Sequence, residues 1–169
     1  MNPVLAAWNE AGDAAAFEAM LACCGAKRWA AAMVALRHIG GVVELSEAAD
    51  RVWSTMNESD WMEAFACHPR IGERKAAHAT AKSVAWSKQE QSSAASASEN
   101  VLAEIAEGNA QYEERYGFTY IVCATGKSAE EMLAILKRRL ASNRASELRE
   151  AAEQQRQITQ IRLGKWLVE

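Results

Sequence analysis

Apolar side chains recur at helical spacing through most of this chain, and this periodicity limits its fold more than any other feature does. Leu133, Leu136 and Leu140 show the spacing clearly, and only two prolines, Pro3 and Pro69, interrupt the chain. The pattern predicts an all-α protein, a multi-helix bundle of about eight helices. The expected helices cover residues 3–10, 13–23, 26–39, 44–56, 58–67, 88–116, 128–142 and 144–167. Ser128 and Glu131 match a capping box at the start of the helix 128–142, and Asn143 suits a turn into the last helix.

The size and charge of the chain narrow its class. With 169 residues it is close to the size of one domain, so we expect a single domain over residues 1–169 with one core. A formal charge of −3 provides no basic surface for phosphate contacts, which argues against nucleic acid as a partner. No segment approaches the roughly 20 apolar residues of a membrane span, and no basic residue precedes Lys27, as a signal peptide would require. We expect a cytosolic protein with no membrane partner.

The four cysteines, Cys23, Cys24, Cys67 and Cys123, form no Cys-x-x-Cys pair and lack the spacing of a structural zinc site. Buried, reduced thiols are therefore expected. Cys67 precedes His68, but neighbours in sequence usually point apart, and catalytic Cys–His pairs come from separate elements.

His68 is the best candidate for a general acid or base, because the residue after it is Pro69. Proline biases the residue before it away from the α region, so His68 should end a helix and project from a defined, non-helical position. Imidazole is the side chain whose ordinary pKa lies near neutrality, which suits it to proton transfer. The alternative is that His68 only caps the preceding helix, where a cation suits the helix dipole.

Residues 118–123 form the one segment rich in aromatic and β-branched side chains, between Gly117 and Gly126. The pattern indicates a buried, extended segment. A single strand has no ladder partner, so its backbone groups must bond to loops, water or a ligand. The segment is thus a candidate for main-chain ligand contacts, and a short connector through the core is the equal alternative.

Ser87 and Glu90 combine a hydroxyl and a carboxylate within one turn, followed directly by Gln91. Their Ser-x-x-Glu spacing also matches a capping box, which would place both residues at the start of the expected helix 88–116. The two interpretations are compatible, because N–H groups at a helix start face anionic ligands.

A fixed cation could complete such a site. Arg162 falls four residues after Ile158, at the edge of the apolar stripe of the last helix, which is expected to turn Leu148, Ala152, Ile158 and Ile161 inward. An arginine in that position needs an anionic partner. His68, Glu90 and Arg162 together would provide a proton-transfer group, a carboxylate and a fixed cation, a set that suits a small anionic substrate.

Neither the remaining histidines nor the known cofactor motifs provide a further candidate site. His38 lies in an expected helix and His78 in a polar loop, so both are expected to be structural or exposed. No His-x-x-x-His, His-Glu-x-x-His or acidic calcium loop occurs, and we expect no metal. Neither Gly-x-Gly-x-x-Gly nor a P-loop is present, which argues against a nucleotide cofactor.

Four motifs, in order along the chain, resemble those of the 2-oxo-4-hydroxy-4-carboxy-5-ureidoimidazoline (OHCU) decarboxylases of urate breakdown. The motifs are His68-Pro69-Arg70-Ile71-Gly72-Glu73, then Ser87-Lys88-Gln89-Glu90-Gln91, then the segment from Tyr116 to Ala124, then Arg162-Leu163. Each is weak alone, but their order and spacing make the combination specific. The similarity runs from about Phe17 to the end of the chain.

The resemblance implies an all-α homodimer that needs no cofactor and converts OHCU to (S)-allantoin with release of CO2. It makes His68 the proton donor, Glu90 its acidic partner and Arg162 the group that holds an anionic oxygen. It implies a substrate pocket formed by residues of all the motifs. These residues are Pro69, Ser87, Lys88, Gln89, Gln91, Val122, Cys123, Ala124, Thr125 and Gly126.

Two other classes of function remain open from the sequence. One is a noncatalytic α-helical binding module, in which His68 and Glu90 are caps and Arg162 forms a surface ion pair. The other is a cofactor-free lyase or hydrolase that acts on a related ureide or imidazoline.

Overall fold

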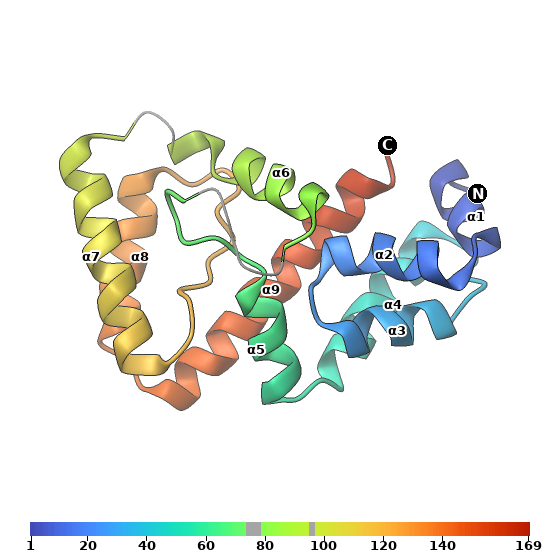
Figure 1. Cartoon of the computed structure of the whole chain (residues 1–169), viewed down its shortest axis with the longest axis horizontal. Coiled ribbons are helices and arrows are strands. Elements are labelled where there is room, and N and C mark those ends of the chain that lie inside the picture. The colour runs from blue at the N-terminus through green and yellow to red at the C-terminus, as the bar shows by residue number, and fades with distance from the viewer. Residues whose placement is uncertain (74–78, 95–96) are drawn as a thin grey trace. The chain divides into compact units, whose positions relative to one another are not determined.

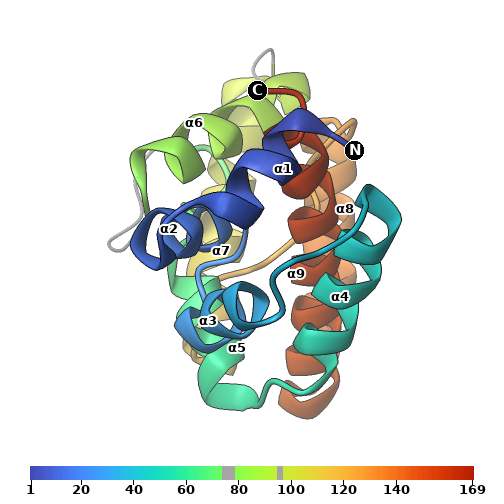
Figure 2. The same cartoon turned by 90° about the vertical axis from the view of Figure 1, so that its right-hand side faces the viewer.

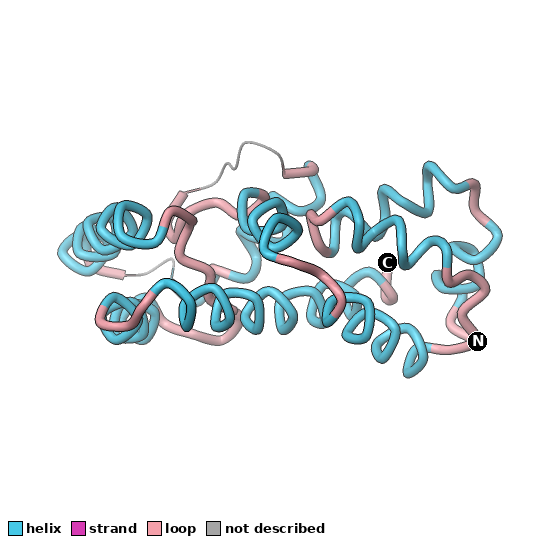
Figure 3. Tube along the Cα trace, turned by 90° about the horizontal axis from the view of Figure 1, so that it is seen from below, coloured by secondary structure: helices cyan, strands magenta, loops and turns pink. Residues whose placement is uncertain are grey.

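The structure, a computed structural model, describes residues 1–73, 79–94 and 97–169 of the chain. Nine α-helices and one short 3-10 helix account for the regular structure of these residues, and no strand occurs among them (Figure 3). The all-α prediction is therefore confirmed for the described part. The helices are α1 (Pro3–Glu10), α2 (Asp13–Cys23), α3 (Lys27–Ala35), α4 (Val42–Ser54), α5 (Glu58–Ala66), α6 (Ala81–Glu90), η1 (Ser92–Ala94), α7 (Glu99–Tyr116), α8 (Ala129–Leu140) and α9 (Arg144–Trp166). None of the described helices is both long enough and apolar enough to cross a membrane.

The chain divides into two compact units. The first comprises residues 1–64 and 156–169, and the second comprises residues 65–155. The boundary between them therefore falls inside α9.

The first unit is built around helices α2, α3 and α4, with α3 lying beside each of the other two (Figure 1). Trp29 of α3 is fully buried, and its indole N–H donates to the carbonyl of Ala49 at 3.1 Å. Helix α4 also runs beside the C-terminal part of α9 (Figure 2), where the Gln160 amide donates to Asp50 at 2.8 Å and accepts from the Ser46 hydroxyl at 2.7 Å.

The second unit is organised by α7 and α8, which lie side by side (Figure 1). Gly108 allows their close approach, because a Cβ atom there would lie 2.6 Å from Leu136 Cδ2. Tyr112, Tyr116 and Phe118 stack against one another at the C-terminal end of α7, with ring centroids 4.6 to 6.4 Å apart. This aromatic cluster begins the segment that links the two helices.

Several local predictions from the sequence are confirmed. The Ser128 hydroxyl accepts from the backbone N–H of Glu131 at 3.1 Å and caps α8, and Asn143 Oδ1 accepts from Ser146 N at the start of α9. Phe118 and residues 120–124 are buried without forming a strand. The four cysteines are buried thiols that form no disulfide with one another, as expected.

The prediction of one helix over residues 88–116 is wrong. Thr80 accepts from Ser83 N at 3.0 Å and caps α6, which begins at Ala81, before the expected helix, whereas Ser98 accepts from Val101 N and caps α7. Ser87 and Glu90 therefore lie in the last turn of α6 and do not form a capping box at a helix start. The hydroxyls of Thr80 and Ser98 define these helix starts, neither of which is predicted from the sequence.

Of the two histidines outside the motifs, His38 and His78, only His38 lies among the described residues. The expected helix 26–39 ends at Ala35, which leaves His38 outside α3, where its exposed ring contacts Glu10 Oε1 at 3.0 Å. His78 lies outside the described residues.

Candidate functional site

His68 occupies the non-helical position that the sequence predicts. Helix α5 ends at Ala66, and the N–H of His68 closes a turn onto the carbonyl of Phe65 at 3.1 Å, directly before the buried Pro69. The imidazole Nε2 lies 2.6 Å from Oε1 of Gln155 in α9. An amide oxygen only accepts hydrogen bonds, so this contact requires a hydrogen on Nε2.

The residues after His68 are anchored on both sides. Arg70 forms a two-point ion pair with Glu113 of α7, with nitrogen–oxygen distances of 2.7 and 2.8 Å, and this pairing raises the pKa of the guanidinium. Gly72, with φ of +90°, donates its N–H to the Gln91 side-chain oxygen at 3.0 Å. The first two sequence motifs are thus joined directly, at the end of α6.

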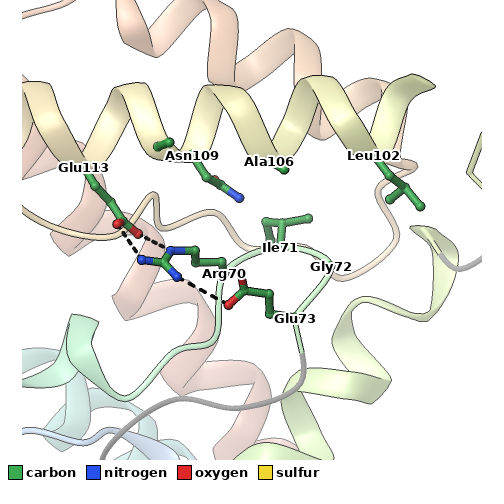
Figure 4. A pocket seen from close by; sticks show the side chains of 9 residues that line it. Arg70, Ile71, Gly72, Glu73, Leu102, Ala106, Asn109 and Glu113 are labelled. Carbon is green, nitrogen blue, oxygen red and sulfur yellow. Dashed lines mark hydrogen bonds and ion pairs between the residues drawn. The ribbon is translucent and has the colours of Figure 1, made fainter. Parts of the chain in front are cut away.

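A pocket of about 450 Å³ lies between this tract and α7 (Figure 4). The buried Asn109 points from α7 toward the tract, and its Oδ1 makes no hydrogen bond with any residue that the structure describes. Arg70 lies between Glu113 and Glu73 at the rim of the pocket, and its Nη1 is 3.6 Å from Glu73 Oε2. The pocket is lined by Arg70, Ile71, Gly72, Glu73, Leu102, Ala106, Asn109, Ala110 and Glu113.

The residues of the second motif lie on two faces of α6, one buried and one exposed to solvent. Ser87 and Glu90 are buried, at 3% and 8% exposure, because residues three apart share one face of a helix. Lys88 and Gln89 are exposed. The buried face of α6 therefore carries the hydroxyl and the carboxylate.

The segment at residues 121–126 bonds through its backbone to side chains, as expected of a strand without a ladder partner. Cys123 donates its N–H to Gln154 Oε1 at 2.8 Å, and its carbonyl accepts from Lys127 Nζ at 2.7 Å. Val122, Cys123 and Ala124 are buried, whereas Thr125 and Gly126 form an exposed turn in which Gly126 has φ of +76°.

A buried ionic cluster supports the same segment. Arg139 of α8 donates through Nη1 to the carbonyl of Ile121, and its Nε donates to Glu147 Oε1 at 2.6 Å. Tyr112 donates its hydroxyl to the same carboxylate oxygen at 2.7 Å, and burial raises the pKa of this phenol. The guanidinium fork joins the segment to α7, α8 and α9.

Arg162 lies in the first unit, and its convergence with His68 and Glu90 stays a prediction. Its burial corrects one detail of the expected stripe on the last helix: Arg162 is only 2% exposed, whereas Ile161 is half-buried. Leu148, Ala152 and Ile158 are buried as predicted. An arginine so enclosed has a functional or structural partner of opposite charge or polarity.

Comparison with known proteins decides the family. A model of the family described as OHCU decarboxylase matches residues 9–164. The chain belongs to the OHCU decarboxylase family. The single family match spans both units and all four sequence motifs, so the resemblance seen in the sequence is confirmed.

Individual relatives agree with this assignment. The chain is 35% identical to the uric acid degradation bifunctional protein TTL of Arabidopsis thaliana over 144 residues, which cover 85% of this chain and 44% of that protein. It is 32% identical over 97 residues to the 2-oxo-4-hydroxy-4-carboxy-5-ureidoimidazoline decarboxylase of Amia calva, which is 57% of this chain and 55% of that protein. The matches thus span about half the length of these curated relatives.

Two solved structures share the fold. A crystal structure of OHCU decarboxylase in the presence of (S)-allantoin is 33% identical, with a TM-score of 0.75, and the match covers 94% of this chain and 100% of that one. A crystal structure of (S)-allantoin synthase, at 17% identity, has a TM-score of 0.72 over 96% of this chain and 53% of that one. The second likeness shows the fold alone.

Within the family fold, the structure identifies two supporting groups that were not predicted from the sequence. Gln154 and Gln155 contact Cys123 and His68 respectively, and Arg139 contacts Ile121. Gln154 and Gln155 were not predicted because two adjacent glutamines in a polar helix are typical of a solvent-exposed face. Arg139 follows Arg138 in the last turn of its helix, where a basic pair normally complements the helix dipole.

Among the described residues, no group of three or more His, Cys, Asp or Glu side chains is arranged to hold a metal ion.

Proposed function

We propose that this chain decarboxylates OHCU to (S)-allantoin and CO2 in urate breakdown. The match of the family model over residues 9–164 carries the proposal. The geometry of the second unit supports it, because His68 lies outside a helix with its ring hydrogen-bonded to Gln155, and Glu90 is buried on α6. An imidazole and a buried carboxylate are the groups that a proton-transfer site requires.

The substrate's own structure supplies the electron sink. When the bond to the carboxylate carbon breaks, its electron pair forms a double bond to the ureido-bearing carbon, and the neighbouring C=N pair moves onto nitrogen, which takes up a proton. The hydroxyl on the ring carbon then loses its proton to become a carbonyl, and the ureido-bearing carbon gains one. The protein's tasks are orientation, charge stabilisation and delivery of a proton to one face.

We assign these tasks to three residues. His68 delivers the proton to the ureido-bearing carbon, and Glu90 is its acidic partner in the reaction. Arg162 holds an anionic oxygen of the substrate through its guanidinium fork. Proton delivery from a fixed imidazole sets the (S) configuration of the product.

Substrate binding is assigned to the surrounding polar groups. Gln91 Oε1 already accepts from Gly72, which leaves the Gln91 side-chain N–H groups to donate to a substrate carbonyl. Ser87 contributes its hydroxyl, and Pro69 and the backbone of residues 122–126 line the pocket. Lys88 and Gln89, which are exposed, would contact substrate only at its outer edge.

Fresh OHCU, generated from urate, tests the proposal. Addition of the chain should accelerate formation of dextrorotatory (S)-allantoin, followed by circular dichroism. A rate equal to that of the spontaneous reaction, or a racemic product, would refute the proposed function.

Substitutions test the residue roles separately. His68→Ala and Glu90→Ala should each nearly abolish the acceleration, and Arg162→Met should mainly raise KM, because it removes a contact made to the ground state as well. His38→Ala is the matched control, since His38 is exposed and outside the motifs. Full activity in both His68→Ala and Glu90→Ala would make the assigned roles wrong even if the activity is right.

The same proposal includes assembly and location. We infer a homodimer of a single-domain chain in the cytosol, as the family resemblance implies. Sedimentation equilibrium of the purified chain would give twice the monomer mass, and a monomer mass at micromolar concentration would contradict the dimer.

A further inference from the structure

We infer that Gln155 is a positioning residue for the reaction: its amide oxygen holds the His68 imidazole in the Nε2–H tautomer and sets the direction of the ring. The inference rests on the proposed role of His68, but its structural half can be tested without any substrate.

The contact itself defines the tautomer. Gln155 is 0% exposed, and its Oε1 lies 2.6 Å from His68 Nε2. A neutral imidazole carries one hydrogen, and an amide oxygen can only accept it, so in the neutral ring Nε2 is protonated and Nδ1 keeps the lone pair. Nδ1 then takes up the proton that the substrate hydroxyl loses and delivers it to the ureido-bearing carbon. A buried polar side chain at this distance loses its hydrogen bond if the ring turns, which makes rotation of His68 costly.

The choice of glutamine rather than glutamate has a chemical consequence. A buried carboxylate at 2.6 Å would stabilise the imidazolium strongly and hold the proton on the ring. The neutral amide fixes the orientation of the ring while contributing no full charge. His68 therefore keeps the ability to change its protonation state during the reaction.

The preceding residue on α9 places the other half of the candidate site. Gln154 Oε1 accepts the N–H of Cys123 at 2.8 Å, and its Nε2 donates to Glu150 Oε1 at 3.2 Å, one turn earlier on the same helix. Adjacent helical residues point about 100° apart, so two neighbours can reach two different elements. One turn of α9 thus sets both the imidazole and the backbone proposed to bind substrate.

The decisive variant is Gln155→Met, which keeps nearly the same volume but has no acceptor oxygen. Nitrogen–proton NMR correlation spectra of the wild-type chain should show His68 with its hydrogen on Nε2, and a His68→Asn spectrum assigns the signal among the three histidines. In Gln155→Met this signal should give way to a mixture of tautomers. With OHCU, kcat should fall roughly tenfold to a hundredfold while KM changes little, because a misdirected group affects the transition state more than binding.

Two further variants serve as controls. Gln155→Glu retains an acceptor oxygen and should retain the Nε2–H signal, but its carboxylate should hold a second hydrogen on the ring, so kcat should be lower than in the wild type. Gln111→Met makes the same chemical change at an exposed position of α7 and should alter neither the His68 signal nor kcat.

The outcomes separate this inference from the proposed function. A wild-type spectrum with the hydrogen on Nδ1 overturns the inference, even if Gln155→Met does not fold. So does an unchanged kcat in a folded Gln155→Met. Failure of the wild-type chain to accelerate OHCU decarboxylation removes the proposed function and the catalytic half of the inference, while the tautomer is still decided by the spectrum.

Discussion

At the scale of single residues, Arg139 does the most to hold the candidate binding segment in place. Its guanidinium bonds to Glu147, to the carbonyl of Ile121 and, at 3.3 Å, to the Tyr112 hydroxyl. The group also lies over the rings of Tyr112 and Tyr120, 5.7 and 5.0 Å from their centroids. With both Arg139 and Glu147 less than 5% exposed, removal of one partner leaves a buried charge without its counterion.

We expect Arg139→Met to lower the free energy of unfolding by about 3–5 kcal/mol, because Glu147 would stay buried and lose its ion pair. Urea unfolding followed by circular dichroism would measure the change. Arg138→Met, at the exposed neighbouring position, should stay within about 0.5 kcal/mol of the wild type.

The double variant Arg139→Met/Glu147→Leu checks the reason given for this loss. It should recover part of the stability, because no isolated charge remains. A double variant that is less stable than Arg139→Met alone would show that the ion pair is not the cause.

At the scale of elements, the second unit depends on the close contact between α7 and α8. Gly108 is a glycine within an α-helix, which costs about 1 kcal/mol relative to alanine. The compensation is the space given to Leu136, whose Cδ2 would lie 2.6 Å from an added Cβ. Gly164 of α9 provides a contrast, since nothing lies within 4 Å of the same added atom.

Gly108→Ala should therefore destabilise the chain by up to about 2 kcal/mol, since overpacking of roughly 1–3 kcal/mol exceeds the gain in helix propensity. Gly164→Ala should instead raise the free energy of unfolding, by up to about 1 kcal/mol. Thermal and urea unfolding of both variants would measure this difference.

In a Leu136→Ala background, the added methyl group at residue 108 has room, so Gly108→Ala should become neutral or stabilising. An equal loss in both backgrounds would contradict the role assigned to the α7–α8 contact.

At the scale of the whole molecule, the buried phenols link folding to high pH. Burial raises the pKa values of Tyr112 and Tyr120, although the nearby Arg139 opposes this rise. The folded chain therefore keeps protons that the unfolded chain releases above the ordinary tyrosine pKa of about 10. The stability that these groups contribute is complete below about pH 10 and is lost as the pH rises toward the folded values.

We expect the free energy of unfolding to change little from pH 9 to about pH 10 and to fall as the pH rises further, with tyrosinate absorbance from these two residues appearing together with unfolding. Urea titrations across this range would measure the slope. The double variant Tyr112→Phe/Tyr120→Phe should be less stable than the wild type at pH 9, because it has lost two buried hydroxyl hydrogen bonds. Its free energy of unfolding should nevertheless fall less steeply with rising pH. An unchanged slope would assign the pH dependence to other groups.

The predictions that succeeded from the sequence concern neighbours along the chain. Ser128 and Asn143 cap the helices that follow them, and Pro69 keeps His68 out of a helix. Each effect acts over three residues or fewer. The error at residues 88–116 is of the same local kind: the Ser87-x-x-Glu90 pattern matches a capping box but lies at the end of α6, and Thr80 and Ser98 cap the helix starts.

The sequence by itself determined the helical class, the motifs that identify the family and the conformation around His68, because these depend on side-chain type and short-range backbone sterics. Only the tertiary structure decided which side chains support the candidate site. Gln155 lies 87 residues from His68 in the chain, and Gln154 lies 31 residues from Cys123. A glutamine or arginine looks the same in sequence whether it faces water or a buried acceptor, and helix packing alone determines which of these it meets.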